Sequence, residues 1–222
     1  MKQTIIILFV AILFAGCNQV QEQNQEVPSD SIIAINEDKD FILDVLMNYR
    51  NMNELVKKFG RENVIIDTLW GPEGMFEIGT KLFPGTKNEV EFMWSDTLNY
   101  TDLFNIQTYA GYDENYNPVF ESDWKTKDGL YIGMPLEELV KINGKPVIFL
   151  GFDWDYGGGI VSFEKGKLDN INLSIGLTYS REPEVTSDSD FSNIIGDVEI
   201  SSDRKNLSKF KIKIVRMGKF RK

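Results

Sequence analysis

The densest group of chemically useful side chains lies at residues 152–159, which read FDWDYGGG. Asp153 and Asp155 place two carboxylates one residue apart, and such oxygens bind hard cations or accept hydrogen bonds from sugar hydroxyls. Trp154 and Tyr156 provide flat rings with one polar end, against which a sugar ring can pack. These four residues therefore predict a ligand-binding loop.

A purely structural interpretation of the same stretch stays open. Three consecutive glycines suit a tight turn, because glycine adopts positive φ at little cost. In this interpretation Trp154 packs into the core, as would Trp70, which occupies the matching place in a similar stretch earlier in the chain.

Histidine is absent, and Cys17 is the only cysteine. These absences exclude Ser-His-Asp triads, histidine-based zinc sites and disulfides. An enzyme would depend on carboxylates, tyrosine or lysine. With 34 acidic residues, carboxylate pairs arise by accident, so we assign none to catalysis. We predict a protein that is not an enzyme and that has neither a cofactor nor a metal.

One further stretch begins like a calcium-binding loop, with Asp113, Asn115 and Asn117 at alternate positions. Pro118 and Trp124 stand where that motif needs glycine and glutamate, so calcium is not predicted there.

The net charge of −10 argues against nucleic acid as a partner. The charge is uneven, because residues 204–222 contain nine basic side chains and no acid. Lys209, Lys211 and Lys213 alternate with apolar residues, which predicts a strand with one charged face. These lysines either contact an anionic surface such as lipid headgroups, or protect an edge strand from pairing with other chains.

The beginning of the chain, up to Cys17, has the organisation of a secretion signal. Lys2 precedes an apolar run at residues 5–15, too short to span a bilayer, and the small residues Ala15 and Gly16 precede Cys17. The pattern resembles the signal of bacterial lipoproteins, although Phe14 replaces the usual leucine. The resemblance implies cleavage before Cys17, acylation of that cysteine and a lipid anchor in the cell envelope. The alternative is an ordinary secretory signal with a chance cysteine.

The residue after the cysteine is Asn18. In some bacteria aspartate at this position retains lipoproteins in the inner membrane, so the resemblance favours the outer membrane and leaves the leaflet open. Residues 17–36 are rich in Gln, Asn and Glu without apolar periodicity, which predicts a flexible tether about 20 Å long on average.

The remaining sequence predicts both helices and antiparallel strands. Apolar residues at helical spacing predict helices at 38–49, 51–60 and 135–144. Alternating or β-branched runs predict strands at 64–69, 75–78, 81–83, 90–94, 104–108, 147–152, 160–163, 170–177, 198–200 and 209–214. Residues 182–190 predict an exposed acidic loop.

A short pattern occurs twice in the chain with a constant offset. Glu-Leu-Val-Lys, two further residues and glycine occur at 54–60 and again at 138–144. A tryptophan follows each glycine at the same distance, Trp70 after Gly60 and Trp154 after Gly144. We interpret this as a duplicated helix-then-sheet unit. Chance similarity is the alternative.

The stretch 129–147, GLYIGMPLEELVKINGKPV, resembles the small α+β module of SmpA/OmlA-type outer-membrane assembly lipoproteins. Tandem copies of such a module build the beta-lactamase inhibitor protein. The resemblance implies two helix-plus-antiparallel-sheet repeats packed side by side, with a concave sheet face that binds another protein.

These observations predict an α+β protein with five parts: a signal peptide at 1–16, the lipidated Cys17 with its tether at 17–36, a first repeat at 37–112, a connecting loop at 113–128 and a second repeat at 129–222. The predicted function is that of a non-enzymatic envelope lipoprotein, which binds a partner protein or scaffolds an assembly. A glycan-binding or glycan-processing lipoprotein is one alternative, and an inhibitor of a secreted enzyme is another.

Overall fold

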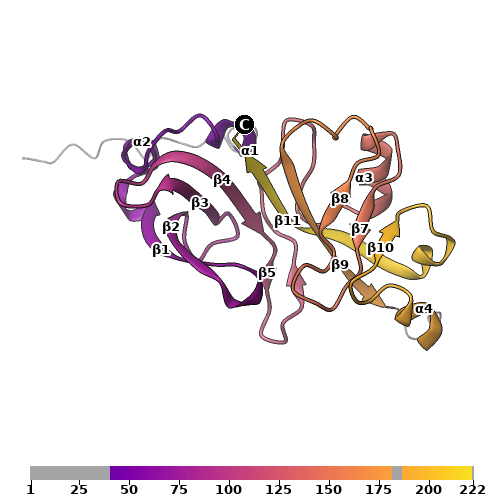
Figure 1. The fold of residues 1–222 in the computed structure, drawn as a ribbon. Coiled ribbons are helices and arrows are strands. Elements are labelled where there is room, and N and C mark those ends of the chain that lie inside the picture. The colour runs from indigo at the N-terminus through magenta and orange to yellow at the C-terminus, as the bar shows by residue number, and fades with distance from the viewer. Residues whose placement is uncertain (1–40, 182–186, 222) are drawn as a thin grey trace, which may run out of the picture. The chain divides into compact units, whose positions relative to one another are not determined.

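The computed structural model describes residues 41–181 and 187–221, all within one unit, Asn36–Lys222. The predicted signal peptide, Cys17 and the tether lie outside the described residues. The described chain combines helices with antiparallel sheets, as the α+β class requires (Figure 1).

A six-stranded antiparallel sheet runs through both halves of the described chain. Its strand order is β1-β2-β3-β4-β11-β9. The strands are β1 (Val64–Trp70), β2 (Phe76–Leu82), β3 (Val90–Asp96), β4 (Thr101–Tyr109), β9 (Leu173–Arg181) and β11 (Phe210–Phe220). The C-terminal strand β11 therefore lies between strands from the two halves, and one sheet joins them.

The N-terminal helices are α1 (Leu43–Leu46) and α2 (Met52–Phe59). Asn51 caps α2, because its side-chain oxygen accepts a hydrogen bond from the Glu54 N–H at 3.0 Å. Met52 and Leu55, three positions apart on one face, are buried.

The second half contains α3 (Leu136–Asn143), α4 (Asp188–Ser192) and a three-stranded sheet of order β10-β7-β8. Its strands are β7 (Ile148–Leu150), β8 (Ile160–Ser162) and β10 (Glu199–Ser201). A bridge between Gly159 and Gly176 connects it to β9. The short strands β5 (Gly111–Tyr112) and β6 (Pro118–Val119) pair with each other, and 3₁₀ turns occur at Arg61–Asn63, Pro72–Gly74 and Lys205–Lys209.

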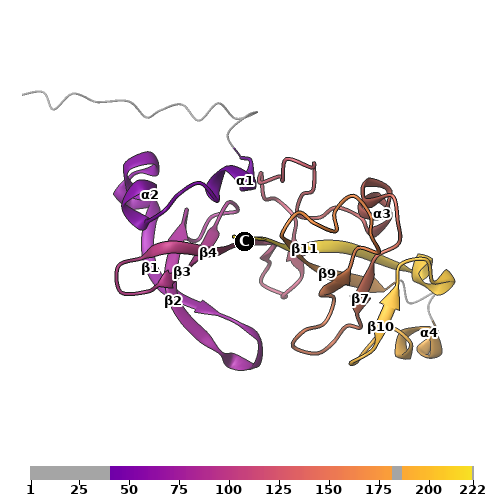
Figure 2. The same cartoon turned by 45° about the horizontal axis from the view of Figure 1, so that its top comes forward.

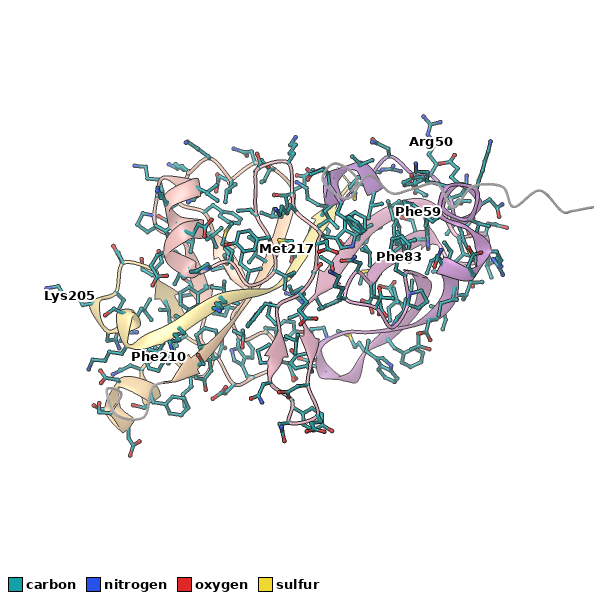
Figure 3. All side chains as sticks on the ribbon, turned by 180° about the vertical axis from the view of Figure 1, so that it is seen from behind. Arg50, Phe59, Phe83, Lys205, Phe210 and Met217 are labelled. Carbon is teal, nitrogen blue, oxygen red and sulfur yellow. The ribbon has the colours of Figure 1, made fainter. Side chains whose placement is uncertain are left out.

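Side chains of the large sheet alternate between two faces, which we call the core face and the cleft face. Cross-strand partners Phe92, Ile106 and Lys219 lie on the core face, and Glu91, Gln107 and Gly218 on the cleft face. One buried cluster extends from Leu43 to Met217 and includes side chains of both halves. Figure 3 shows Met217 between the Phe59–Phe83 pair and Phe210.

Four predicted elements differ from the structure. Over the described residues 41–49, the helix predicted at 38–49 is reduced to α1, because Ile42 is extended and bridges Lys125. The strands predicted at 75–78 and 81–83 form a single β2, in which the Leu69 side chain fills the place of a Cβ at Gly79. Part of the predicted acidic loop is α4, which Ser187 and Asp190 start with a capping box.

Candidate functional site

One cleft of the described chain has a volume of about 590 Å³, within the usual range for ligand sites. The floor of the cleft is formed by Met93 of β3, Gln107 and Tyr109 of β4, and Arg216 of β11. Register places Tyr109 directly opposite Arg216, and the Tyr109 hydroxyl donates a hydrogen bond to Gln107 Oε1 at 2.7 Å. Antiparallel pairing thus brings residues that are far apart in the sequence into one polar surface.

A β-bulge at Val215 determines where Arg216 points. Ile212 and Ile214 are buried on the core face, and simple alternation would put residue 216 on the same face. The register shifts by one residue between Ile214 and Arg216, so that Met217 faces the core and Arg216 the cleft. The bulge thereby keeps a guanidinium out of the hydrophobic core.

The β1–β2 hairpin extends to a free tip (Figure 2), and apolar residues of this tip line the cleft. Trp70 and Phe76 are opposite each other in the ladder, with ring centroids 5.5 Å apart. The two side chains are 67% and 64% exposed, and Met75 beside them is 57% exposed. This exposure corrects the structural interpretation in which Trp70 packs into the core.

The predicted loop at 152–159 does not bring its four functional side chains together. Asp155 lines the cleft, together with residues of the hairpin. Asp153, with φ of +65°, instead accepts a hydrogen bond from the Tyr179 hydroxyl at 3.0 Å. The half-buried Trp154 donates its indole N–H to the Gly151 carbonyl at 2.8 Å. Tyr156 packs edge-on against Trp154, with centroids 5.4 Å apart, and is 39% exposed.

A group of ionisable side chains lies next to the cleft floor. The Lys81 ammonium contacts the carboxylates of Glu89 at 3.0 Å and Glu91 at 3.7 Å. Burial raises the pKa of Glu91 above its ordinary value, against the opposing effects of Tyr109 and Lys81. Burial also raises the pKa of Tyr109, and the nearby charge of Glu91 adds to this rise. Tyr109 is therefore a neutral hydrogen-bonding group at physiological pH, not a base.

The three predicted surface lysines are in different environments. Lys209 forms an ion pair with Asp190, Lys213 lies 4.9 Å from the centre of the Phe120 ring, and Lys211 is exposed. Their strand β11 pairs with β9 along one side, and on the other side Lys213 bridges Pro135. The interpretation that these lysines protect an open edge is therefore wrong. Contact with an anionic surface stays a prediction.

The stretch resembling a calcium loop closes on itself. The Asp113 carboxylate accepts hydrogen bonds from the backbone N–H groups of Asn115 and Asn117, each at 2.8 Å. Within residues 41–181 and 187–221, no three acidic, histidine or cysteine side chains are grouped to hold a metal ion. Over the same residues, none of the helices combines the length and the apolar composition needed to cross a bilayer.

Sequence reasoning found Asp155 but missed Trp70 and Arg216. A signal for Trp70 was present, since an apolar strand end followed by Gly71 and Pro72 indicates a hairpin tip. No local signal marked Arg216, because its direction depends on the bulge.

Comparison of the chain with protein-family models, with curated proteins and with solved structures gives no match.

Proposed function

We propose that this protein is a lipid-anchored envelope protein that binds a partner protein and catalyses no reaction. The signal pattern ending at Cys17 supports the anchor, and the resemblance of 129–147 to assembly lipoproteins supports the partner. In this proposal the protein lies at the outer membrane.

We further propose that the chain is a tandem duplication. Helices α2 and α3 have equal lengths and begin at Met52 and Leu136, with the same offset that separates Gly60 from Gly144. Each of these glycines follows its helix and donates its N–H to the carbonyl of a valine in the last turn, at 2.9 Å for Gly60 and 2.8 Å for Gly144. The starts of β1 and β7 repeat this offset once more. These coincidences support a common origin of the two units.

The observation that carries the partner proposal is the open edge of β1. Within the described residues β1 pairs only with β2. Hydrogen bonds from Phe83 to Asn63 and from Gly71 to Met75 show that odd-numbered residues bond across this ladder. Because bonded and non-bonded pairs alternate, Ile66 and Thr68 direct their backbone groups outward. The Thr68 N–H is met only by the carboxylate of its neighbour Asp67, at 2.8 Å.

Exposed apolar side chains accompany this edge. Ile66 is 45% exposed and Ile78, on β2, is 41% exposed. Both share a face with Trp70 and Phe76, since cross-strand partners lie on one side of a sheet. An extended segment of another protein, apolar at alternate positions, would pair with β1 and cover this strip.

In vivo photocrosslinking tests this surface. We expect a crosslinking residue at Ile66 to capture one defined envelope protein, and the same residue at the exposed Val161 of β8 to capture none. Thr68→Pro removes an outward N–H and is tolerated at an edge, so it should abolish the adduct. Thr68→Ala keeps the N–H and should retain it. An adduct containing only a second copy of this chain, or none, contradicts the proposal.

Labelling with radioactive palmitate tests the anchor. We expect the intact chain to incorporate label and to fractionate with the outer membrane, and Cys17→Ser to do neither. Incorporation by Cys17→Ser, or none by the intact chain, contradicts the lipoprotein interpretation.

A second candidate function is saccharide binding in the cleft. It is favoured by one observation: Asp155 lines the same cleft as Trp70 and Phe76, which are 67% and 64% exposed. Carboxylate oxygens next to flat aromatic surfaces suit sugar hydroxyls and the apolar face of a sugar ring.

A further inference from the structure

In the part of the chain that the structure describes, Arg216 is a cation without a counter-ion. None of the residues at 41–181 and 187–221 places a carboxylate within ion-pair distance of its guanidinium, and its Nε is buried without a hydrogen-bond partner. Leaving a buried charged donor unsatisfied is costly, so such a group indicates a missing acceptor. Arg216 as a whole is only half-buried and lines the cleft, so a bound ligand can accept hydrogen bonds from the terminal nitrogens of its guanidinium.

The surroundings of Arg216 add a second donor and leave room for an acceptor. Among the described residues, the Gln107 amide nitrogen contacts only the Met93 sulfur, at 3.6 Å, and a thioether is a weak acceptor. Gly176 and Gly218 flank Arg216 on the cleft face, so no side chains project there. The floor therefore offers two donors beside an open space, which suits a carboxylate.

The walls indicate the rest of the ligand. Trp70 and Phe76 present more than half of their surface, which suits a ring that packs flat. Glu77 and Asp155 also line the cleft and suit hydroxyl donors. These two carboxylates would repel a highly charged ligand, since like charges a few ångströms apart are strongly unfavourable.

We propose that the cleft binds a saccharide bearing a single carboxylate, as in a terminal uronic acid. Arg216 and Gln107 hold the carboxylate, Trp70 packs on the ring, and Glu77 and Asp155 accept hydrogen bonds from hydroxyls. This inference rests on the second candidate function, saccharide binding in the cleft.

Calorimetry with the full-length chain in detergent tests the inference. The probes are disaccharides ending in glucuronic or galacturonic acid, and their carboxyl-reduced neutral counterparts. We expect the acids to bind at least about tenfold more tightly, the gain that one charge-assisted hydrogen bond gives. Arg216→Gln should remove this difference and leave neutral binding intact, whereas Trp70→Ala should weaken both. Arg61→Gln, at an exposed arginine outside the cleft, is the matched control.

The outcomes separate the two claims. Equal binding of acids and neutral sugars overturns the role of Arg216 but keeps the cleft as a saccharide site. No binding of any sugar overturns both. Binding of N-acetylphenylalanine without sugar binding shows a peptide carboxylate site, and overturns the saccharide proposal.

Discussion

Arg216 lies across Gly176 of the neighbouring strand, so closely that a Cβ on Gly176 would be 3.2 Å from the Arg216 Nε and 3.3 Å from its Cβ. Gly176 is not among the glycines with positive φ, so its role here is to leave space. The absence of one side chain on β9 therefore lets the guanidinium lie along the cleft floor.

The first prediction concerns this contact. Gly176→Ala should displace Arg216 by a few tenths of an ångström or more, and weaken binding of the acidic disaccharides while neutral ones bind as before. The melting temperature should change little, because alanine suits a strand at least as well as glycine. Gly111→Ala is the control, since its new Cβ would meet no atom closer than 3.9 Å. Unchanged acid binding in Gly176→Ala would show that this packing is not needed.

A second prediction concerns the buried ion pair between Lys219 and Asp44. Their charged atoms are 2.8 Å apart, with side chains 6% and 18% exposed. Asp44→Ala leaves the ammonium with only the Ile171 carbonyl, at 3.3 Å, and should lower the free energy of unfolding by about 3–5 kcal/mol in urea titrations. Lys219→Met should lower the free energy of unfolding by less, because methionine fills the space without a charge.

The exposed pair Lys87–Asp123, with side chains 50% and 42% exposed, is the reference. Lys87→Met should cost less than about 1 kcal/mol. If Asp44→Ala and Lys87→Met lower the free energy of unfolding by similar amounts, water reaches Lys219.

The third prediction is a pH dependence at Glu91. Its pKa is raised in the folded state, so the folded chain binds this proton more tightly than the unfolded chain. The stabilisation from this proton is complete below the unfolded pKa, about 4.3, and is lost as pH rises through the folded pKa. Glu91→Gln cannot ionise, so it avoids this loss of stability and should raise the melting temperature at pH 7. The rise in melting temperature should vanish near pH 4.

Glu89→Gln is the matched control for this series. Glu89 is the nearest carboxylate to Lys81, at 3.0 Å, and its side chain is 29% exposed. Its removal should give no gain at pH 7. A destabilised Glu91→Gln at pH 7 would mean that the contact with Lys81 outweighs the burial of Glu91.

The fourth prediction concerns the buried amide at the end of α3. Asn143 is 1% exposed and donates to the carbonyls of Lys145 at 3.0 Å and Phe163 at 2.9 Å. Its oxygen accepts from the Leu168 N–H at 3.1 Å. Asn143→Leu leaves the Lys145 carbonyl and the Leu168 N–H without partners and should cost about 2–3 kcal/mol or more in urea titrations. The exposed Asn193→Ala should cost less than about 1 kcal/mol, and equal costs would contradict the structural role.

Local patterns in the sequence determined most of the secondary structure. Asn51 with Glu54 marked the start of α2, and Gly144 marked the end of α3, because capping depends on adjacent residues. The short α1 was beyond such reasoning, since the bridge from Ile42 to Lys125 joins segments that lie far apart in the sequence.

The candidate site, too, could be predicted from the sequence only in part. By itself the sequence determined which chemistry is absent, histidine and disulfide chemistry above all, and it identified Asp155 as a candidate ligand contact. Only the tertiary structure decided that Trp70 is exposed and that Arg216 faces the cleft. The physical reason is that the direction of a strand side chain follows from register, and one bulge, set by partners far along the chain, reverses it.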